Sequence, residues 1–198
     1  MDPRENLLAD RPAPVAERAD AARNRARILT AAGQLFTTRD PRTVTMDDIA
    51  RAAGVGRGTL YRRYPDIAAI ATALLDEHER DLQEKLLRGA PPLGPGAPPT
   101  ERLAAFYAAM VELLEHHADL VLGTESGGAR FDTGAYGFWS AHVRALLAEA
   151  GVREPEALVD VLLAPLAAEV YRYQRARGMS PDAIAAALTT VARAAISE

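Results

Sequence analysis

The stretch TMDDIARAAGVGRGTLYRRYP, from Thr45 to Pro65, has the residue spacing of a helix-turn-helix. Ile49 and Ala50 fall on one face of a first short helix, and Leu60 returns from a second helix to meet Ala50. Gly54 stands between the two helices, where a glycine takes a positive φ without the strain that a side chain would bring. The small side chain of Ala50 allows the helices to cross closely. The stretch therefore predicts a compact helical hairpin.

The second helix of this hairpin carries side chains that suit DNA. Arginine pairs with guanine edges through two N–H donors, and threonine and tyrosine hydroxyls suit phosphate oxygens. A glycine near the start of the second helix keeps it slim, and a threonine N-cap on the first helix leaves positive backbone dipoles for a phosphate. The spacing alone also fits an ordinary surface hairpin with solvated arginines. The predicted DNA-binding residues are Thr45, Arg57, Gly58, Thr59, Tyr61, Arg62, Arg63 and Tyr64.

The flanking sequence and the distribution of charge favour the DNA-binding interpretation. A helical stripe upstream can cover the back of the hairpin and make a three-helix unit; its residues are Ile28, Leu29, Ala32, Leu35 and Phe36. The whole chain has a net charge of −4. From Arg18 to Asp66, however, ten arginines stand against five aspartates, whereas Ile67 to Glu198 holds eleven basic and eighteen acidic residues. A basic head on an acidic body fits a protein that touches DNA with one end.

These residues resemble the TetR family of bacterial transcriptional repressors, over about the first third of the chain. Two departures from the family pattern are Ile67, where the family often has a phosphate-binding lysine, and Arg63, where it often has histidine. The matching segments are Arg27-Ile28-Leu29 with Ala31-Ala32 and Leu35-Phe36, Thr43-Val44-Thr45-Met46 with Ile49-Ala50, Ala53-Gly54-Val55, and Gly58-Thr59-Leu60-Tyr61 with Tyr64-Pro65.

The resemblance implies an all-α fold with a three-helix helix-turn-helix DNA-binding head and a larger helical ligand-binding and dimerisation body. We expect a disordered tail over residues 1–19, a DNA-binding domain over 20–66, and an effector-binding and dimerisation domain over 67–198. The implied partners are a double-stranded operator, a small-molecule effector and a second copy of the chain. The acidic and proline-containing start of the chain lacks the apolar core of a signal peptide, which favours a cytoplasmic protein.

Beyond Pro65 the hydrophobic spacing stays helical. It predicts a helix from Asp66 to Gly89, a proline-rich loop from Gly89 to Thr100, and a helix through Leu103–Leu114. A glycine-rich break follows, and no segment alternates as strands do. The later predicted helices are Phe138–Leu147, Glu154–Arg177 and Ser180–Ile196.

The resemblance also assigns two functions to the body. Aromatic and apolar side chains of its middle helices would line an effector cavity, although core packing explains each of them as well; the candidates are Phe106, Met110, Phe138, Trp139, His142 and Tyr171. The last two helices would pair two copies, unless a monomer buries both apolar stripes itself. The candidate interface residues are Leu158, Leu162, Leu166, Ile184, Leu188 and Val191.

Other function classes receive little support. The chain has no cysteine, which excludes disulfides and thiolate metal sites, and we expect neither a metal nor a cofactor. Neighbouring His116 and His117 diverge on a helix, and no apolar run is long enough to span a bilayer. Ser126 in GTESGG offers a weak hydrolase alternative, because Thr124 replaces the first glycine of a nucleophile elbow and no strand precedes it.

We therefore expect a transcriptional repressor that a small apolar effector releases from its operator, and not an enzyme. A DNA-binding activator or architectural protein without induction is the alternative.

Overall fold

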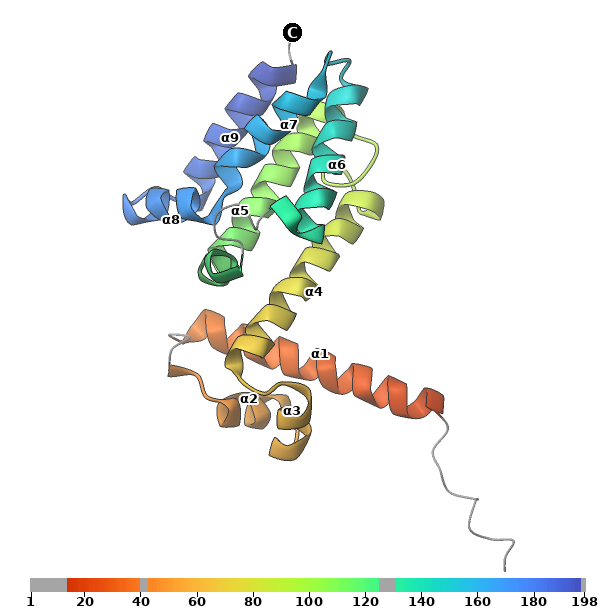
Figure 1. Ribbon diagram of the computed structural model, residues 1–198, viewed down its shortest axis with the longest axis vertical. Helices are drawn as coiled ribbons and strands as arrows, with labels where there is room; N and C mark the ends of the chain where they lie inside the picture. The colour runs from red at the N-terminus through yellow and green to blue at the C-terminus, as the bar shows by residue number, and fades with distance from the viewer. Residues whose placement is uncertain (1–13, 40–42, 125–130, 197–198) are drawn as a thin grey trace, which may run out of the picture. The chain divides into compact units, whose positions relative to one another are not determined.

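A computed structural model describes residues 14–39, 43–124 and 131–196, and within these ranges the chain is helical and contains no strand (Figure 1). The chain divides into two compact units, Met1–Leu74 and Leu75–Glu198. The expected all-α fold, a small N-terminal helical unit followed by a larger helical body, is confirmed.

The N-terminal unit consists of α1 (Pro14–Thr38), α2 (Met46–Ala53), α3 (Arg57–Arg63) and the first turns of α4 (Ile67–Arg88). Its core contains the predicted stripe of α1 together with the residues at which α2 and α3 cross. Each helix contributes one apolar face, as the periodicity of the sequence predicts. The buried core residues are Ile28, Leu29, Ala31, Ala32, Val44, Met46, Ile49, Ala50, Ala53, Leu60, Tyr64, Ile70, Ala73 and Leu74.

Two bounds of this unit differ from the sequence expectation. The unit ends at Leu74 and not at Asp66, because Ile70, Ala73 and Leu74 of α4 pack into its core. Helix α1 begins at Pro14, so part of the expected tail is helical, in keeping with the high helix propensity of its alanine, glutamate and arginine residues. Residues 1–13 lie outside the described residues.

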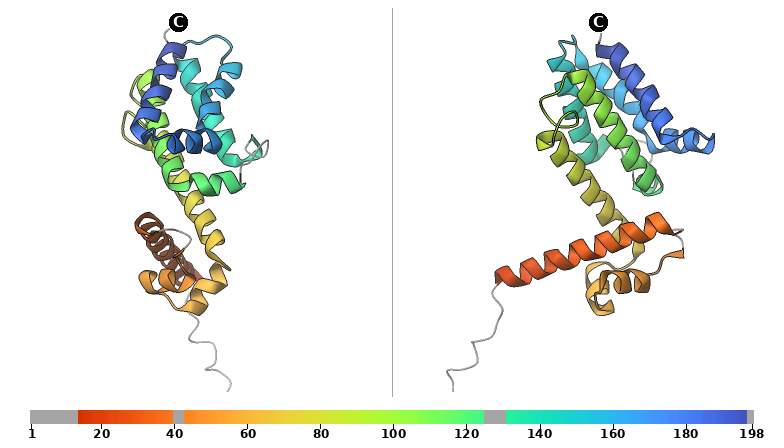
Figure 2. Two further views of the ribbon diagram at one scale, coloured as in Figure 1. Left: turned by 90° about the vertical axis from the view of Figure 1, so that its left-hand side faces the viewer. Right: turned by 180° about the vertical axis from the view of Figure 1, so that it is seen from behind.

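The body combines the rest of α4 with α5 (Pro99–Thr124), α6 (Gly134–Glu149), α7 (Pro155–Leu163), the short 3₁₀-helix η3 (Ala164–Leu166), α8 (Ala168–Ala176) and α9 (Pro181–Ile196). Helix α5 is the central element: it packs against α6, α8 and α9, and it runs between α6 and α9 (Figure 2). Phe106, Tyr107 and Leu103 of α5 are almost fully buried. The body core is therefore organised around one long helix.

One predicted helix of the body is wrong. The stretch from Glu154 to Arg177 forms α7, η3 and α8 in place of a single helix. Pro165 lacks an N–H donor and its ring clashes with the preceding helical turn, and Ala167 takes an extended conformation with φ −62° and ψ 134°. The chain therefore turns between α7 and α8.

The structure also corrects the predicted interface stripes. Leu162, Leu166, Ile184 and Leu188 are buried in the core of the chain itself and lie against α5 and its neighbours. They face inward because α7, η3 and α9 cover the body core, which is the arrangement that a monomer requires. Leu158 is partly buried against the same core, and Val191 is exposed.

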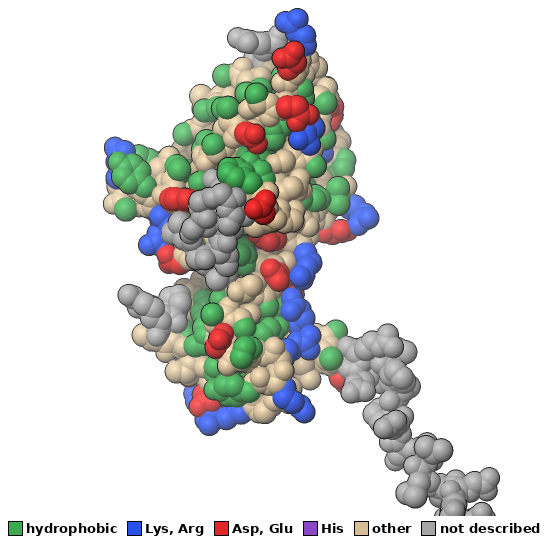
Figure 3. Space-filling model, viewed as in Figure 1, with side chains coloured by type: hydrophobic (Ala, Val, Ile, Leu, Met, Phe, Trp, Pro, Cys, Tyr) green, Lys and Arg blue, Asp and Glu red, His purple; other side chains and the backbone are tan. Residues whose placement is uncertain are grey.

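Other large apolar residues are accessible on these last helices. Val161 of α7, Val170 and Tyr173 of α8, and Val191 of α9 are all exposed, Tyr173 with 63% of its surface. Hydrophobic side chains are visible at the surface over α8 and α9 (Figure 3). An interface on the last helices would use these residues in place of the buried stripe.

Candidate nucleic-acid interface

The first helix of the hairpin begins with a reciprocal cap. The Asp48 N–H donates to the Thr45 hydroxyl at 3.2 Å, and the Thr45 N–H donates to the Asp48 carboxylate at 3.1 Å. The Thr45 hydroxyl also donates to the Asp48 carboxylate at 2.6 Å, and this bond together with the one from the Thr45 N–H lowers the pKa of Asp48. The predicted N-cap is confirmed. Its hydroxyl is occupied within the hairpin, so a phosphate contact by Thr45 stays a prediction.

The turn of the hairpin depends on Gly54 and on an arginine from α1. Gly54 has φ 61° and ψ 39°, and its N–H donates to the carbonyls of Ala50 and Arg51. The Gly54 carbonyl accepts a hydrogen bond of 2.8 Å from Arg27 Nη2. A Cβ atom at position 54 would lie 2.6 Å from the same Arg27 nitrogen. Arg27 thus joins α1 to the turn, a role that its place in the sequence pattern does not reveal.

Helix α3 presents most of the predicted DNA-binding residues to solvent. Leu60 is fully buried, whereas Arg57, Tyr61, Arg62 and Arg63 are exposed. Lys and Arg side chains lie at the edge of the N-terminal unit that α2 and α3 form (Figure 3). An added Cβ at Gly58 would meet no atom within 4 Å. This face of α3 is therefore narrow near its start and cationic along its length.

Tyr64 differs from the other predicted residues. Its ring is buried in the N-terminal core, and its hydroxyl accepts a hydrogen bond of 3.2 Å from Arg25 Nη1. A buried ring leaves little surface for a ligand. We therefore assign Tyr64 to the core, which it fills at the end of α3.

Each arginine of α3 has a different partner. Arg57 Nη2 forms an ion pair with Asp47 Oδ2 of α2. Arg62 Nη2 donates to the Thr59 hydroxyl at 3.4 Å, and Arg63 Nη1 donates to the Ala21 carbonyl of α1 at 3.1 Å. Between α1 and α3 lies an open hollow, which the sequence alone does not predict because its two sides are far apart in the chain. Its lining residues are Asp20, Ala21, Asn24, Ile28, Thr59, Arg62 and Arg63.

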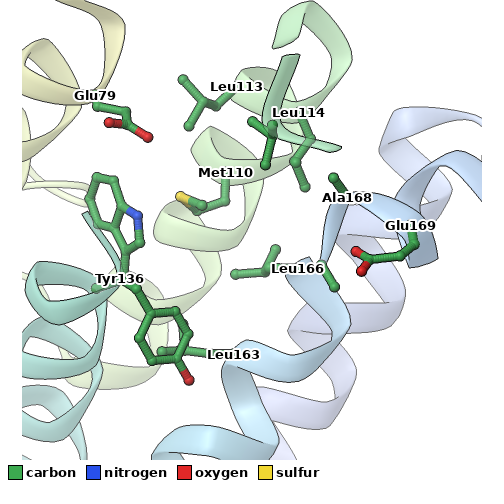
Figure 4. Close-up of a pocket in the computed structure, with 12 residues that line it drawn as sticks. Glu79, Met110, Leu113, Leu114, Tyr136, Leu163, Leu166, Ala168 and Glu169 are labelled. Atoms are coloured by element: carbon green, nitrogen blue, oxygen red, sulfur yellow. The ribbon is translucent and has the colours of Figure 1, made fainter. Parts of the chain in front are cut away.

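The body holds a cavity of about 40 Å³ among α4, α5, α6, η3 and α8. Met110 and Trp139, two of the predicted ligand-binding residues, line it. Figure 4 shows Met110 and Leu166 at the cavity, with Glu79 and Glu169 on opposite sides of it. Among the lining residues these two glutamates carry the charge, and the sequence analysis does not anticipate them.

The other predicted ligand-binding residues do not line this cavity. The Phe106 ring is tilted against Trp139 and the Phe138 ring meets it edge to face, with ring centroids 5.9 and 5.4 Å away. His142 is buried 5.4 Å from Phe106, and burial lowers its pKa to about 4. Tyr171 donates its hydroxyl proton to Glu115.

Two histidines of the body are paired between neighbouring helices. His78 Nδ1 and His117 Nε2 lie 2.7 Å apart and share a hydrogen bond between α4 and α5. Among the described residues, no group of three or more His, Cys, Asp or Glu is placed to hold a metal ion. Ser126, the weak hydrolase candidate, lies outside the described residues. No helix in the part of the chain that the structure describes could cross a membrane.

Comparisons with known proteins agree with this geometry. Residues 28–74 match the family described as "Bacterial regulatory proteins, tetR family". An uncharacterized HTH-type transcriptional regulator of Mycobacterium tuberculosis strain H37Rv is 44% identical over 61 residues. This match covers 31% of the chain and 30% of that relative, so the chain covers less than a third of the relative's length.

Solved structures extend the likeness of fold to most of the chain. A TetR-like transcriptional regulator from Rhodococcus sp. RHA1 has a TM-score of 0.57 and 20% identity, and the match covers 88% of this chain and 97% of that one. RolR, solved in complex with resorcinol, has a TM-score of 0.53 and 20% identity, with coverage of 91% and 96%. At these identities the likeness shows the fold alone.

The hairpin, its cap and its turn define a helix-turn-helix unit of the kind found in bacterial transcriptional regulators. The match over residues 28–74 shows that the N-terminal unit is similar to the DNA-binding region of the TetR family. The family and the relatives named above are transcriptional regulators and not enzymes. The resemblance that the sequence suggests is thereby confirmed.

The turn provides a stability test with two glycines of the same hairpin. Gly54→Ala should destabilise the N-terminal unit by about 1–2 kcal/mol, because alanine is strained at positive φ and would also crowd Arg27. Gly58→Ala should stabilise it by about 0.5–1 kcal/mol, because position 58 is helical and open. Urea unfolding followed by circular dichroism measures both changes. Equal effects of the two substitutions would contradict the assigned role of Gly54.

Proposed function

We propose that the chain is a DNA-binding transcriptional regulator that reads an operator with α3. The observation that carries the proposal is the cationic face of α3, with exposed Arg57, Arg62 and Arg63 on a helix that Leu60 anchors in the core. The N-terminal residues of a recognition helix contact base edges, and surrounding cations contact phosphates. Arg57, in the first turn, is the base-reading candidate, whereas Arg63 lies at the end of α3 beside α1.

Two substitutions separate these roles. Arg63→Ala should weaken binding to all duplexes about equally and make the salt dependence shallower by about one unit per head, because one phosphate contact is lost. Arg57→Ala should reduce discrimination between the preferred duplex and its variants by about 1–3 kcal/mol. Fluorescence anisotropy with a selected and a scrambled duplex, at several salt concentrations, gives both quantities. Wild-type binding that ignores ionic strength would refute the proposal.

We also propose that two copies associate through the exposed apolar residues of α7, α8 and α9. Support comes from Val161, Tyr173 and Val191, which leave large apolar surface in water on the last helices. Two heads on one symmetric operator would double the contacts and fix the spacing of its half-sites.

Substitutions on α9 can distinguish a loss of dimerisation from a loss of folding. Val191→Asp should produce a folded monomer, because its charge would be buried only between two copies. Leu188→Asp should unfold the body, because a charge at this core position costs several kcal/mol. Ala145→Asp, on the exposed face of α6, adds the same charge elsewhere and is the control. Light scattering combined with circular dichroism distinguishes these outcomes, and a wild-type monomer at micromolar concentration would reject the dimer.

The finer proposal is a repressor that leaves DNA when a small apolar effector binds the body. The cavity beside Met110 and Trp139 supports a site, but its 40 Å³ hold only a few water molecules. An effector therefore has to displace side chains, and the unbranched Met110 is well suited to move. Glu79 and Glu169 disfavour an anionic effector. An activator or architectural protein would bind the same DNA, and reporter transcription separates it from a repressor.

Trp139 reports on this cavity, because it is the single tryptophan of the chain. A neutral phenol that enters should shift or quench its emission, and resorcinol, the ligand in the RolR structure, is the first compound to use. Linkage requires that the compound weaken operator binding by the factor by which the operator weakens compound binding. A shift in Trp139 emission with unchanged operator affinity would leave a binding cavity without a regulatory role.

A further inference from the structure

We propose that Asp47 is a specificity-determining residue, which orients Arg57 for guanine and penalises contacts with phosphate. This inference rests on the proposed DNA-binding function. It starts from an acidic residue in an unexpected place: Asp47 belongs to α2, in the basic head, and its carboxylate meets the arginine in the first turn of α3.

The neighbouring Asp48 makes different contacts from those of Asp47. The Asp48 carboxylate closes the reciprocal cap with Thr45 and lies within 3.6 Å of Arg51. The Asp47 carboxylate is directed across the hairpin to Arg57 and pairs two helices that the turn at Gly54 separates. The capping of α2 therefore does not require Asp47, and its pairing with Arg57 is a property of the reading face.

The chemistry of the guanidinium allows two partners at once. Arginine has five N–H donors in a planar fork, so one edge can hold a carboxylate while another meets O6 and N7 of guanine. Arg57 remains largely exposed while paired, with 72% of its side chain accessible. Asp47 thus reduces the conformations of Arg57 without covering it.

The Asp47 carboxylate also weakens non-specific binding to DNA. A negative charge beside the reading helix repels phosphates, and a paired Arg57 is less available to bind them. Arg62 donates to the Thr59 hydroxyl and Arg63 donates to the Ala21 carbonyl. Both acceptors are neutral, so they do not balance the positive charges of the two arginines. We therefore assign affinity to Arg62 and Arg63, and discrimination to the Asp47–Arg57 pair.

The test begins with the full-length protein and a randomised duplex pool. Wild type selects its preferred sequence, and affinities for that duplex and for a scrambled duplex then define its specificity ratio. Asp47→Asn should raise affinity for the scrambled duplex about two- to fivefold, the range of an exposed ion pair. It should lower the specificity ratio about three- to tenfold and relax one guanine position, which is part of the discrimination that a bidentate arginine provides.

Two further variants isolate the pair. In an Arg57→Ala background, Asp47→Asn should no longer change the preference at the guanine position, because Asp47 acts through Arg57. Asp76→Asn removes the same charge from an exposed ion pair with Arg80 on α4 and should leave the specificity ratio at the wild-type value. Circular dichroism checks that each variant is folded.

The outcomes test the role of Asp47 separately from the proposed DNA-binding function. If wild type enriches no sequence from the pool, both the proposed function and the role of Asp47 fall. If wild type enriches a sequence and Asp47→Asn retains the same preference, the role of Asp47 alone is refuted. An equal change in Asp76→Asn, or a change in guanine preference by Asp47→Asn that persists without Arg57, also overturns it.

Discussion

Helix α3 is seven residues long, and isolated helices of this length do not persist in water. The candidate reading surface therefore depends on the burial of Leu60, which is fully enclosed by α1, α2 and the first turns of α4. Ala50 contributes by being small where α2 and α3 cross. The arginines on the outer face add charge but little stability, because they are exposed to solvent.

A second constraint is that one helix belongs to two cores. Ile70 and Leu74 of α4 are buried with α1 and α2, whereas Leu75, Leu82 and Leu86 are buried with the body. The change of core falls between consecutive residues of a continuous helix. Helix α4 therefore contributes apolar residues to both cores.

The N-terminal hairpin could be predicted from the sequence because its determinants are local. Thr45 and Gly54 lie at the ends of α2, and Ala50 and Leu60 are separated by a single turn. The contact of Arg27 with the Gly54 carbonyl could not be predicted, because the two residues are far apart in the chain and no spacing encodes their contact. The pairing of Asp47 with Arg57 lies within the same hairpin, but apolar periodicity does not describe the partners of charged side chains. In the body, periodicity marked Leu162, Ile184 and Leu188 as apolar positions, whereas Val191 of the same predicted stripe is exposed. A stripe has the same period whether it faces the protein's own core or a second copy, and so the positions of Leu162 and Leu188 required the structure.

Glu115 illustrates how exposure and tolerance to substitution can diverge. Its carboxylate accepts from the Tyr171 hydroxyl and, through both oxygens, from Arg175, whose other nitrogen donates to the Met179 carbonyl. One acidic side chain of α5 thus fixes the nine-residue α8 and the turn that follows it. A mutational library that randomised residues by accessibility would treat position 115 as free, because it lies at the surface. Its replacement would leave a buried tyrosine and a half-buried arginine without this acceptor, so its sequence variation should follow the rules of an interior position.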